Sequence, residues 1–254
     1  MSQTQHDFVA GHYAPRAAAY VASAVHSAGA DLDQIEAFVR GHADARVLDL
    51  GCGGGHVSYR VAPHVREVVA CDLTPDMLDQ VRRTARERGL TNIVAQQGAA
   101  EQLPFANGAF DIVVTRFSAH HWRDMEAGLR EARRVLKKAG RAVFADVAAP
   151  AHPLLDTHLQ TLELLRDPSH VRNYNVGEWI AALGRAGFSA TGLTARKLRM
   201  EFPVWVERTK TPEPYRTALR MLQAKASQAV RDHFAIDDDG SFDLDALTIE
   251  AVAG

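Results

Sequence analysis

An apolar segment that runs directly into a glycine-rich loop most constrains what this chain can fold into. Residues 47–50 (VLDL) are followed by residues 51–56 (GCGGGH). Glycine lacks a Cβ atom, so Gly51, Gly53 and Gly55 can adopt positive φ angles and let a ligand approach the main chain. A glycine loop between a strand and a helix can also present free N–H groups to a ligand. We therefore expect a ligand-binding turn at the end of a buried strand.

The spacing within the loop decides between ligand classes. The dinucleotide fingerprint G-x-G-x-x-G/A needs a small residue at the position of His56, where it allows close packing of the helix on the strand. Asp49 comes shortly before the first glycine, and its charge would repel a diphosphate but suits a ligand with an ammonium group. An NAD-dependent oxidoreductase is therefore an alternative that fits the loop poorly.

A second carboxylate follows the next apolar segment. Residues 68–71 (VVAC) predict a short buried strand, and Asp72 lies at its carboxyl end, about 20 residues after the loop, where a carboxylate can accept both hydroxyls of a ribose. We expect Leu73 to lie against an adenine ring. Residues 74–76 (TPD) supply an N-cap, a first-turn proline and an acidic first turn, so they predict a helix that ends near Gly89.

Four segments in order carry a family pattern: the D-x-G-x-G-x-G loop within residues 47–55, Asp72, residues 98–105 (GAAEQLPF), and the apolar residues 110–114 leading into residues 116–122 (RFSAHHW). Together they cover roughly residues 46–146. They resemble the class I S-adenosylmethionine-dependent methyltransferases, and within them the small-molecule branch that includes the ubiquinone and menaquinone C-methyltransferases.

The resemblance implies an α/β fold with a Rossmann-like, doubly wound sheet, mostly parallel, with a C-terminal antiparallel hairpin and an N-terminal helical lid. It implies that the chain transfers a methyl group from S-adenosyl-L-methionine to a small organic molecule by in-line displacement, without a metal. A protein that binds S-adenosylmethionine without turnover is the alternative from another class. The cofactor is expected to contact Asp49, Gly51, Cys52, Gly53, Gly55, Asp72, Leu73, Met77, Ala99, Ala100, Glu101, Arg116, Phe117 and Ser118.

One position departs from the family pattern. Many relatives have Asp at the position of Ala99, where the carboxylate accepts a hydrogen bond from the adenine amino group. A hydrogen bond to a charged group is worth about 1.5–3 kcal/mol, so we expect weaker cofactor binding or a compensating backbone carbonyl. The N–H of Ala100 remains for an adenine ring nitrogen.

His120 and His121 are the candidate catalytic residues, because they follow the fourth predicted strand where the acceptor is expected to enter. An imidazole titrates near physiological pH. Adjacent strand residues face opposite sides, so we expect only one of the two to reach the acceptor, and packing beside Trp122 is the alternative for both. Methyl transfer mainly requires that two reactants be positioned and water excluded, and a base matters only for an alcohol, a phenol or an enolisable carbon.

Several neighbouring residues have two open interpretations. Arg116 could pair with the cofactor carboxylate or with Asp111. Asp146 could face the acceptor or cap a helix. Glu101 could lie near the adenine or accept from a backbone N–H. Residues 173–175 (NYN) could line the acceptor pocket or form a cap and a loop.

The composition limits the classes of partner that we expect for this chain. The 254 residues include 29 basic and 31 acidic side chains and carry a formal net charge of −2, so no nucleic-acid footprint is visible. The two cysteines, Cys52 and Cys71, are best interpreted as reduced small hydrophobes. Residues 1–14 lack the pattern of a signal peptide, and no apolar run reaches the roughly 18 residues that span a bilayer. We expect a cytoplasmic protein with a small-molecule methyl acceptor, no nucleic-acid partner and no membrane span, and the sequence does not predict an oligomeric state.

The chain is expected to form a single domain with three parts: a helical lid over residues 1–40, a cofactor-binding core over residues 41–150, and acceptor-side helices and strands over residues 151–254. For the first part, a packing extension of the core is the alternative. Its apolar anchors are Phe8, Tyr13, Tyr20, Val21 and Val25, of which Tyr13 or Tyr20 is expected to reach the methionine end of the cofactor.

Hydrophobic periodicity predicts the remaining elements. Parallel strands are expected over residues 46–50, 68–71, 93–96, 110–115 and 141–146. After them we expect helices over residues 153–166 and 176–186, an edge strand over residues 198–206 containing Pro203, one helix over residues 214–234, and a last strand over residues 244–252.

Overall fold

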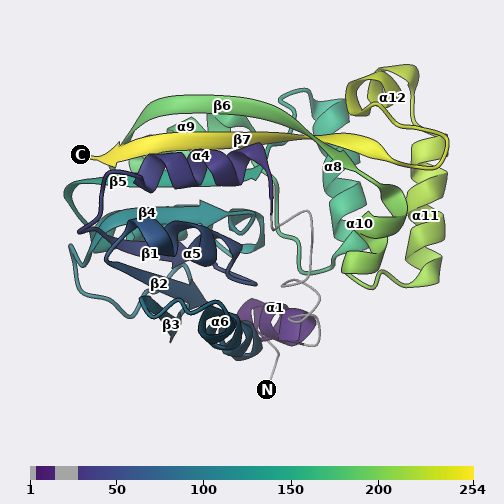
Figure 1. Ribbon diagram of the computed structural model, residues 1–254. Coiled ribbons are helices and arrows are strands. Elements are labelled where there is room, and N and C mark those ends of the chain that lie inside the picture. Colours follow the sequence, from purple (N-terminus) through teal and green to yellow (C-terminus); the bar gives the residue numbers. More distant parts are fainter. Residues whose placement is uncertain (1–3, 15–27) are drawn as a thin grey trace.

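The computed structural model describes residues 4–14 and 28–254, whose centre is a seven-stranded sheet in the order β3-β2-β1-β4-β5-β7-β6. Its first five strands run parallel, and β7 is antiparallel to both of its neighbours. This confirms the expected Rossmann-like sheet with a C-terminal antiparallel hairpin (Figure 1). The strands are β1 (Arg46–Leu50), β2 (Glu67–Asp72), β3 (Ile93–Gln97), β4 (Phe110–Arg116), β5 (Leu136–Val147), β6 (Phe188–Met200) and β7 (Phe242–Ala253).

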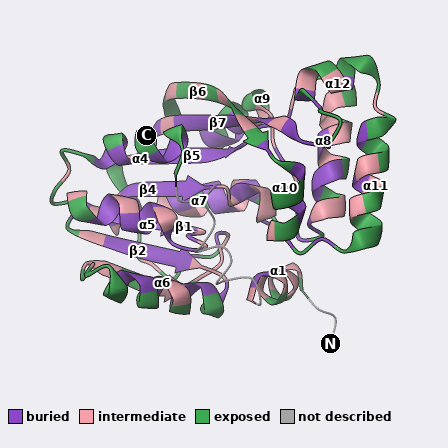
Figure 2. Ribbon diagram, turned by 45° about the vertical axis from the view of Figure 1, so that its right-hand side comes forward, coloured by how far each residue is buried: buried purple, intermediate pink, exposed green. Residues whose placement is uncertain are grey.

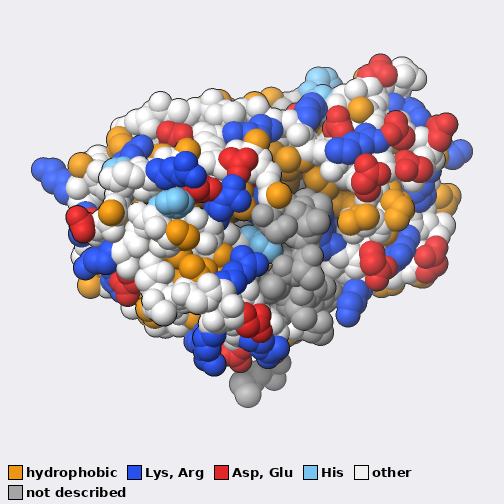
Figure 3. All heavy atoms as spheres, in the orientation of Figure 1, with side chains coloured by type: hydrophobic (Ala, Val, Ile, Leu, Met, Phe, Trp, Pro, Cys, Tyr) orange, Lys and Arg blue, Asp and Glu red, His pale blue; other side chains and the backbone are white. Residues whose placement is uncertain are grey.

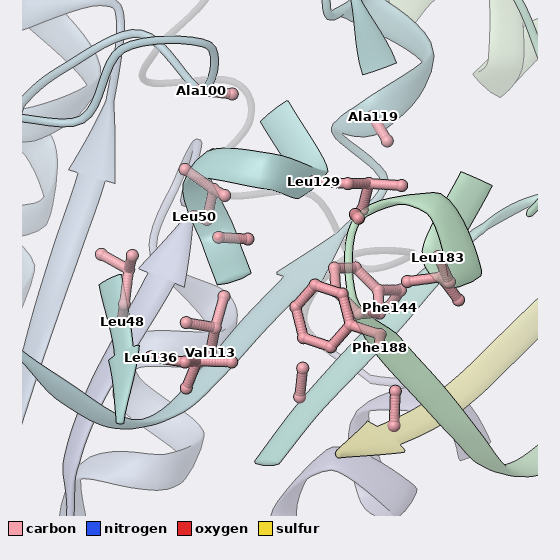
Figure 4. Packing of buried hydrophobic residues seen from close by; sticks show 14 of the residues in the cluster. Leu48, Leu50, Ala100, Val113, Ala119, Leu129, Leu136, Phe144, Leu183 and Phe188 are labelled. Carbon is pink, nitrogen blue, oxygen red and sulfur yellow. The ribbon is translucent and has the colours of Figure 1, made fainter. Parts of the chain in front are cut away.

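Side-chain alternation along β1 divides the core between the two faces of the sheet. Val47 packs into a cluster with buried residues of α4 (Ala30–Val39) and α5 (His56–Val61). Leu48 belongs to the cluster on the other face, which is covered by α7 (Met125–Val135) and α9 (Val176–Arg185). In that cluster Phe144, Leu183 and Phe188 gather in one group (Figure 4). The central strands are mostly buried, whereas the outer helices combine buried, intermediate and exposed residues (Figure 2).

The two described N-terminal helices pack against different parts of the molecule. α1 (Gln5–Tyr13) begins at a capping box, in which Thr4 and Asp7 each accept the other's backbone N–H, and it packs beside Met77 near the start of α6 (Pro75–Glu87). α4 instead joins the core as a packing extension. The predicted anchors Tyr20, Val21 and Val25 lie outside the described residues.

The predicted helix near Asp72 is present as α6, which ends before Gly89 with φ +67°. Short 3₁₀ helices cover residues Ala62–His64 (η2) and Ala119–His121 (η3). The second of these follows β4 directly, at the edge of the sheet where the site lies.

Two predictions for the C-terminal part are wrong. The expected strand over residues 198–206 ends at Met200, and α10 (Phe202–Arg208) follows, because Pro203 lacks an N–H and fits the first turn of a helix. The expected helix over residues 214–234 is interrupted, so that α11 (Glu213–Ala224) and α12 (Gln228–Phe234) are separate.

A helical group stands at the end of the β6–β7 hairpin (Figure 1). It consists of α8 (Pro153–Arg166) with α10, α11 and α12, and it has its own apolar cluster, which includes Leu159, Trp205, Leu219 and Phe242. Basic and acidic side chains are interspersed on the face shown in Figure 3, including the outer surface of this group. Within residues 4–14 and 28–254, no helix combines the length and the apolar character that crossing a membrane requires.

Candidate functional site

The glycine loop after β1 brings the main chain to the edge of an open space. Gly51, Gly53 and Gly55 have φ angles of +70°, +48° and +81°, as expected for a turn that needs glycine. A Cβ atom at Gly51 would lie 1.9 Å from Ser118 Oγ, so the loop after β4 approaches too closely for any other residue. A Cβ atom at Gly53 would meet no atom within 4 Å. Gly53 is therefore the position at which the loop backbone is open to a ligand.

A cavity lies against this loop, at the carboxyl ends of β1, β2 and β4. β1 is flanked by β2 and β4, so the strand order changes direction at this point, where ligands bind in open α/β sheets. The empty volume is about 1290 Å³, which includes open solvent at the mouth. The cavity collects twelve of the residues expected from the sequence: Gly51, Gly53, Asp72, Leu73, Met77, Ala99, Ala100, Glu101, Phe117, Ser118, His120 and His121.

Asp72 connects the glycine loop to the end of β2. Its Oδ2 accepts from the Gly53 N–H at 2.8 Å, and its Oδ1 accepts from the Thr74 N–H at 2.9 Å. Burial raises the pKa of Asp72, while these backbone hydrogen bonds act in the opposite direction. Each carboxylate oxygen can accept more than one hydrogen bond, so both remain able to bind ligand hydroxyls.

Four of the expected cofactor contacts do not line the cavity: Asp49, Cys52, Gly55 and Arg116. Asp49 shares a sheet face with Val47 and lies under α5, where its Oδ2 accepts from Ser58 N at 3.0 Å and Ser58 Oγ at 2.6 Å. Burial raises the pKa of Asp49 to about 7, against the effect of the Ser58 hydrogen bonds. In this structure Asp49 supports the start of α5.

Cys52 and Gly55 also support the loop from behind. Cys52 is a free thiol that packs with Tyr59 and Leu78, and burial raises its pKa well above the ordinary value. Gly55 occupies the N-cap position of α5, and a Cβ atom there would lie 2.7 Å from the Tyr59 ring. Neither residue presents a reactive group to the cavity.

Arg116, at the end of β4, forms a buried ion pair with Asp31 at the start of α4. The alternative pairing with Asp111 is wrong. Asp111 lies toward the amino end of β4, where it accepts from Lys137 Nζ at 2.6 Å and from the Arg46 N–H at 2.9 Å. Because Asp111 and Arg116 lie toward opposite ends of one strand, their side chains cannot meet.

His120 and His121 both line the cavity, and their ring centroids are 4.2 Å apart. They lie on the 3₁₀ turn η3 and not on a strand, so strand alternation does not separate their side chains. His120 Nδ1 lies 2.5 Å from Asp146 Oδ1. Asp146 is therefore the partner of His120, and it is neither a cavity-lining residue nor a helix cap.

The surroundings shift the pKa values of the two histidines in opposite directions. Burial disfavours protonation of His120, but the charge and hydrogen bond of Asp146, together with Glu163 and Asp167, raise its pKa above the usual value. Burial lowers the pKa of His121 to about 3, and the charge of His120 adds to this effect. His120 is therefore the readily protonated member of the pair, whereas His121 stays neutral.

A polar network under α1 was missed in the sequence analysis. The Tyr13 hydroxyl donates to Asp167 Oδ2 at 2.7 Å and lies 2.9 Å from His121 Nε2. Ser169 Oγ donates to Asp167 Oδ1 at 2.6 Å. Burial raises the pKa of Asp167, but the neighbouring His121 ring and the Ser169 and Tyr13 hydrogen bonds outweigh this effect and hold the pKa below its usual value. The D-P-S-H sequence after the predicted helix 153–166 was the available signal.

Glu101 has one of the two roles expected for it. Its Oε1 accepts from the Asp124 N–H at 3.3 Å, at the N-cap of α7, and its Oε2 lies 3.2 Å from His6 Nε2 on α1. Glu101 thus links the segment after β3 to the N-terminal helix and also lines the cavity.

The far half of the cavity is built by segments after residue 146. Its walls are mostly apolar, and they include Val147, Leu198, Met200, Trp205 and Leu244. The polar side chains there come from α8, α10 and the loop before α9, namely Glu163, Arg166, Arg208 and Asn173. The sequence analysis identified only Asn173 among these.

Residues 173–175 divide between the two interpretations. Asn173 lines the cavity, whereas Asn175 caps α9 through a capping box with Glu178. Among the residues that the structure describes, no group of three or more His, Cys, Asp or Glu side chains could hold a metal ion.

Comparisons with known proteins agree with this geometry. A family model described as a methyltransferase domain matches residues 48–144. The chain is 47% identical over 201 residues to the uncharacterized protein YafE of Escherichia coli, covering 79% of this chain and 97% of the relative. It is 35% identical over 233 residues to the uncharacterized methyltransferase YcgJ of Bacillus subtilis, covering 90% of this chain and 92% of the relative.

Solved structures show the same relationship. The crystal structure of YcgJ superposes with a TM-score of 0.85 at 34% identity, covering 88% of this chain and 97% of that one. A putative methyltransferase from Bacillus halodurans has the same TM-score at 31% identity, covering 88% and 99%. The expected family is thereby confirmed, and the chain belongs to the methyltransferases.

Proposed function

We propose that this chain transfers the methyl group of S-adenosyl-L-methionine to a small organic molecule by in-line displacement. One observation carries the proposal: a single cavity joins the glycine loop and Asp72 to a largely apolar chamber that contains the His120 ring. A transferase needs such a continuous space because both reactants must meet away from water. When bound, S-adenosyl-L-methionine supplies a methyl group on a positively charged sulfur.

The half of the cavity beside the glycine loop and Asp72, called the near half below, has residues that fit this cofactor. The open space beside Gly53 can receive its amino-acid portion, and Asp72 can accept from two ribose hydroxyls. Leu73 and Met77 offer apolar surfaces, and the buried Ala100 can offer a backbone N–H to the adenine. The remaining expected contacts behind the loop, Asp49 among them, would act by holding this backbone in place.

We further propose His120 as the residue that removes a proton from the acceptor. Its Nδ1 is bound to Asp146, and no other described hydrogen bond engages the ring, which leaves Nε2 for an acceptor hydroxyl. His120 Nε2 would take up the proton of the acceptor hydroxyl, and Asp146 would stabilise the resulting imidazolium. The methyl group would come from the bound cofactor, which would leave as S-adenosylhomocysteine. Both nitrogens of His121 already have partners, namely Tyr13 and Ser169, so His121 is assigned a positioning role.

Two measurements test the proposal. Calorimetric titration with S-adenosyl-L-methionine is expected to show saturable binding at one site per chain. Incubation with cofactor labelled in its methyl group and with a metabolite library is then expected to label at least one small molecule. Absence of binding would overturn the proposal, and binding without any transfer would favour a protein that binds the cofactor without turnover.

Location and partners are part of the same proposal. A small-molecule acceptor and a cytoplasmic location agree with the near-neutral charge and with two buried free thiols. Fractionation of cells that produce the tagged protein tests the location.

A further inference from the structure

Asn173 carries a buried carboxamide that the protein itself leaves unsatisfied. The residue is 1% exposed and lines the cavity, yet neither Oδ1 nor Nδ2 has a hydrogen-bond partner among the described residues. Buried polar side chains almost always have a partner, and leaving one unpaired destabilises the folded protein. The amide is therefore placed for a partner that the protein does not contain.

The main chain of Asn173, by contrast, is firmly held. Its N–H donates to Gln160 Oε1 at 3.1 Å, and its carbonyl accepts from Gln160 Nε2 at 2.7 Å. The next residue, Tyr174, forms a bridge with Ala148 just after β5. These contacts fix the position of the residue at the edge of the sheet, so the unpaired amide does not result from a loosely placed loop.

The surroundings indicate the chemistry of the missing partner. The half of the cavity to which Asn173 belongs is mostly apolar, with Val147 and Met200 among its walls. The acidic groups around this chamber are already paired, Glu163 with Arg166 at 3.3 Å and Asp146 with His120. An amide is itself neutral and can both donate and accept. A neutral group that does the same is the simplest match.

We propose that Asn173 determines acceptor specificity by binding a neutral hydroxyl group on an otherwise apolar acceptor. A hydroxyl can bind either amide atom, as a donor to Oδ1 or as an acceptor from Nδ2. The inference rests on the proposed function, because it assigns the far half of the cavity to the methyl acceptor. It deepens that function by naming the chemical feature that the acceptor must carry.

A thermodynamic cycle tests the pairing of this residue with a hydroxyl. The probes are β-naphthol and β-methylnaphthalene, which share a shape and differ in one hydroxyl, and the proteins are the wild type and Asn173→Leu. Equilibrium dialysis is expected to show that the wild type binds β-naphthol at least about tenfold more tightly than β-methylnaphthalene, a difference of about 1.4 kcal/mol. In Asn173→Leu the two probes are expected to bind within about twofold of each other, because leucine offers no hydrogen bond.

The same preference in Asn173→Leu as in the wild type would overturn the proposal. So would a wild type that binds β-naphthol no better than β-methylnaphthalene, or that binds neither probe at the limit of solubility. Asn173→Leu is expected to melt at the wild-type temperature or above it, because the substitution removes two unpaired buried polar atoms at similar volume. If Asn173→Leu fails to fold, Asn173→Ala provides the same comparison.

Asn175→Ala is the matched control. It removes the N-cap of α9 two positions away, so it is expected to lower the melting temperature while leaving the preference for β-naphthol intact. Dialysis is performed with and without S-adenosylhomocysteine. If the wild type fails to bind S-adenosylhomocysteine, the proposed function is contradicted. If the cofactor-free wild type shows no preference for β-naphthol, only the role assigned to Asn173 is contradicted.

Discussion

Asp72 illustrates how one side chain can serve both the fold and the ligand. Its oxygens accept from Gly53 and Thr74, so they hold the glycine loop and the start of α6 at a set distance. The same oxygens line the cavity on the side proposed for the ribose.

We predict that Asp72→Ala lowers the affinity for S-adenosylhomocysteine at least about tenfold, or about 1.4 kcal/mol, because two ribose hydrogen bonds are lost. Calorimetric titration measures the change. Asp79→Ala is the control, since Asp79 is an exposed residue of α6 paired only with Arg82 in the described contacts, and its affinity is expected to match the wild type. An unchanged affinity in Asp72→Ala would show that the ribose assignment is wrong.

The buried histidines predict acid sensitivity. Burial lowers the pKa of His121 and of His170 to about 3, and the charge of His120 contributes in both cases, whereas the ordinary value is 6.5. Between these two pH values the unfolded chain binds more protons than the folded one, so the free energy of unfolding falls as the pH drops. His120 acts in the opposite direction, because a raised pKa contributes stability that is lost as the pH rises.

Asp49 and Asp72 act in the same direction as His120, because burial raises their pKa values, and His158 acts with His121 and His170. Because these contributions oppose one another, we predict the contribution of a single group. Between pH about 7.5 and about 5, His170→Gln should lose less stability on acidification than the wild type, because it removes one group that gains a proton on unfolding. His42→Gln, before β1 at the opposite end of the sheet, should retain the wild-type dependence. Parallel pH profiles for the wild type and His170→Gln would contradict this assignment.

Among the elements, α1 reaches the site through polar contacts more than through a large apolar face. Tyr13 bonds Asp167 and approaches His121, and His6 approaches Glu101. Its apolar contacts are made mainly by Val9 and Tyr13 against Met77. An element with few buried apolar contacts opens at a lower free energy than the core.

We predict that Tyr13→Phe destabilises the protein by about 1.5–3 kcal/mol, because it removes a hydrogen bond to the buried Asp167 carboxylate. It should also release S-adenosylhomocysteine faster, since α1 lines the cavity. Chemical denaturation and stopped-flow dissociation measure the two effects. Tyr215→Phe, at a tyrosine that is 48% exposed, should change neither, and a wild-type dissociation rate in Tyr13→Phe would exclude a closing role for α1.

Local sequence signals predicted most elements but not all of their boundaries. Strand β1 and helix α8 have the expected ends because a glycine loop and a proline mark them. Residues 198–206 alternate in hydrophobicity, which a strand explains, yet the second half of this segment is helical. The alternation arises because Phe202 and Val206 share one helix face, four positions apart, and the short helix leaves too few residues for its period to appear.

On the scale of the whole molecule, most residues that line the cavity beside the glycine loop could be predicted from the sequence, and those that line the opposite half could not. The near half comes from strand ends and the loops that follow them, so each contact lies within a few residues of a recognisable motif. The far half is assembled from α8, α10, β6 and β7, whose relation in space depends on tertiary packing. The Tyr13–Asp167 contact, which joins residues 154 positions apart, was beyond the reach of local patterns for the same reason.

The separate apolar cluster of the helical group predicts a partly independent response to core mutations. Leu219 and Leu129 are both fully buried, the first in this cluster and the second beside the sheet. Leu219→Ala is expected to lower the free energy of unfolding by about 2–5 kcal/mol. Hydrogen exchange should increase first in α8 and α11, while the variant still binds S-adenosylhomocysteine. Leu129→Ala, the matched change, should instead increase exchange in the sheet. The same pattern of hydrogen-exchange protection in both variants would show that the two clusters unfold together.

The long C-terminal hairpin has a consequence for how this enzyme family can diversify. Met200 at the end of β6 pairs with Phe242 at the start of β7, so the intervening residues 201–241 leave and re-enter the sheet at neighbouring points. A segment with adjoining ends can be exchanged as a cassette without disturbing strand register elsewhere. Transplanting residues 201–241 from a relative would thus replace Trp205 and Arg208, two contributors to the proposed acceptor side of the cavity, while the glycine loop and Asp72 stay in place.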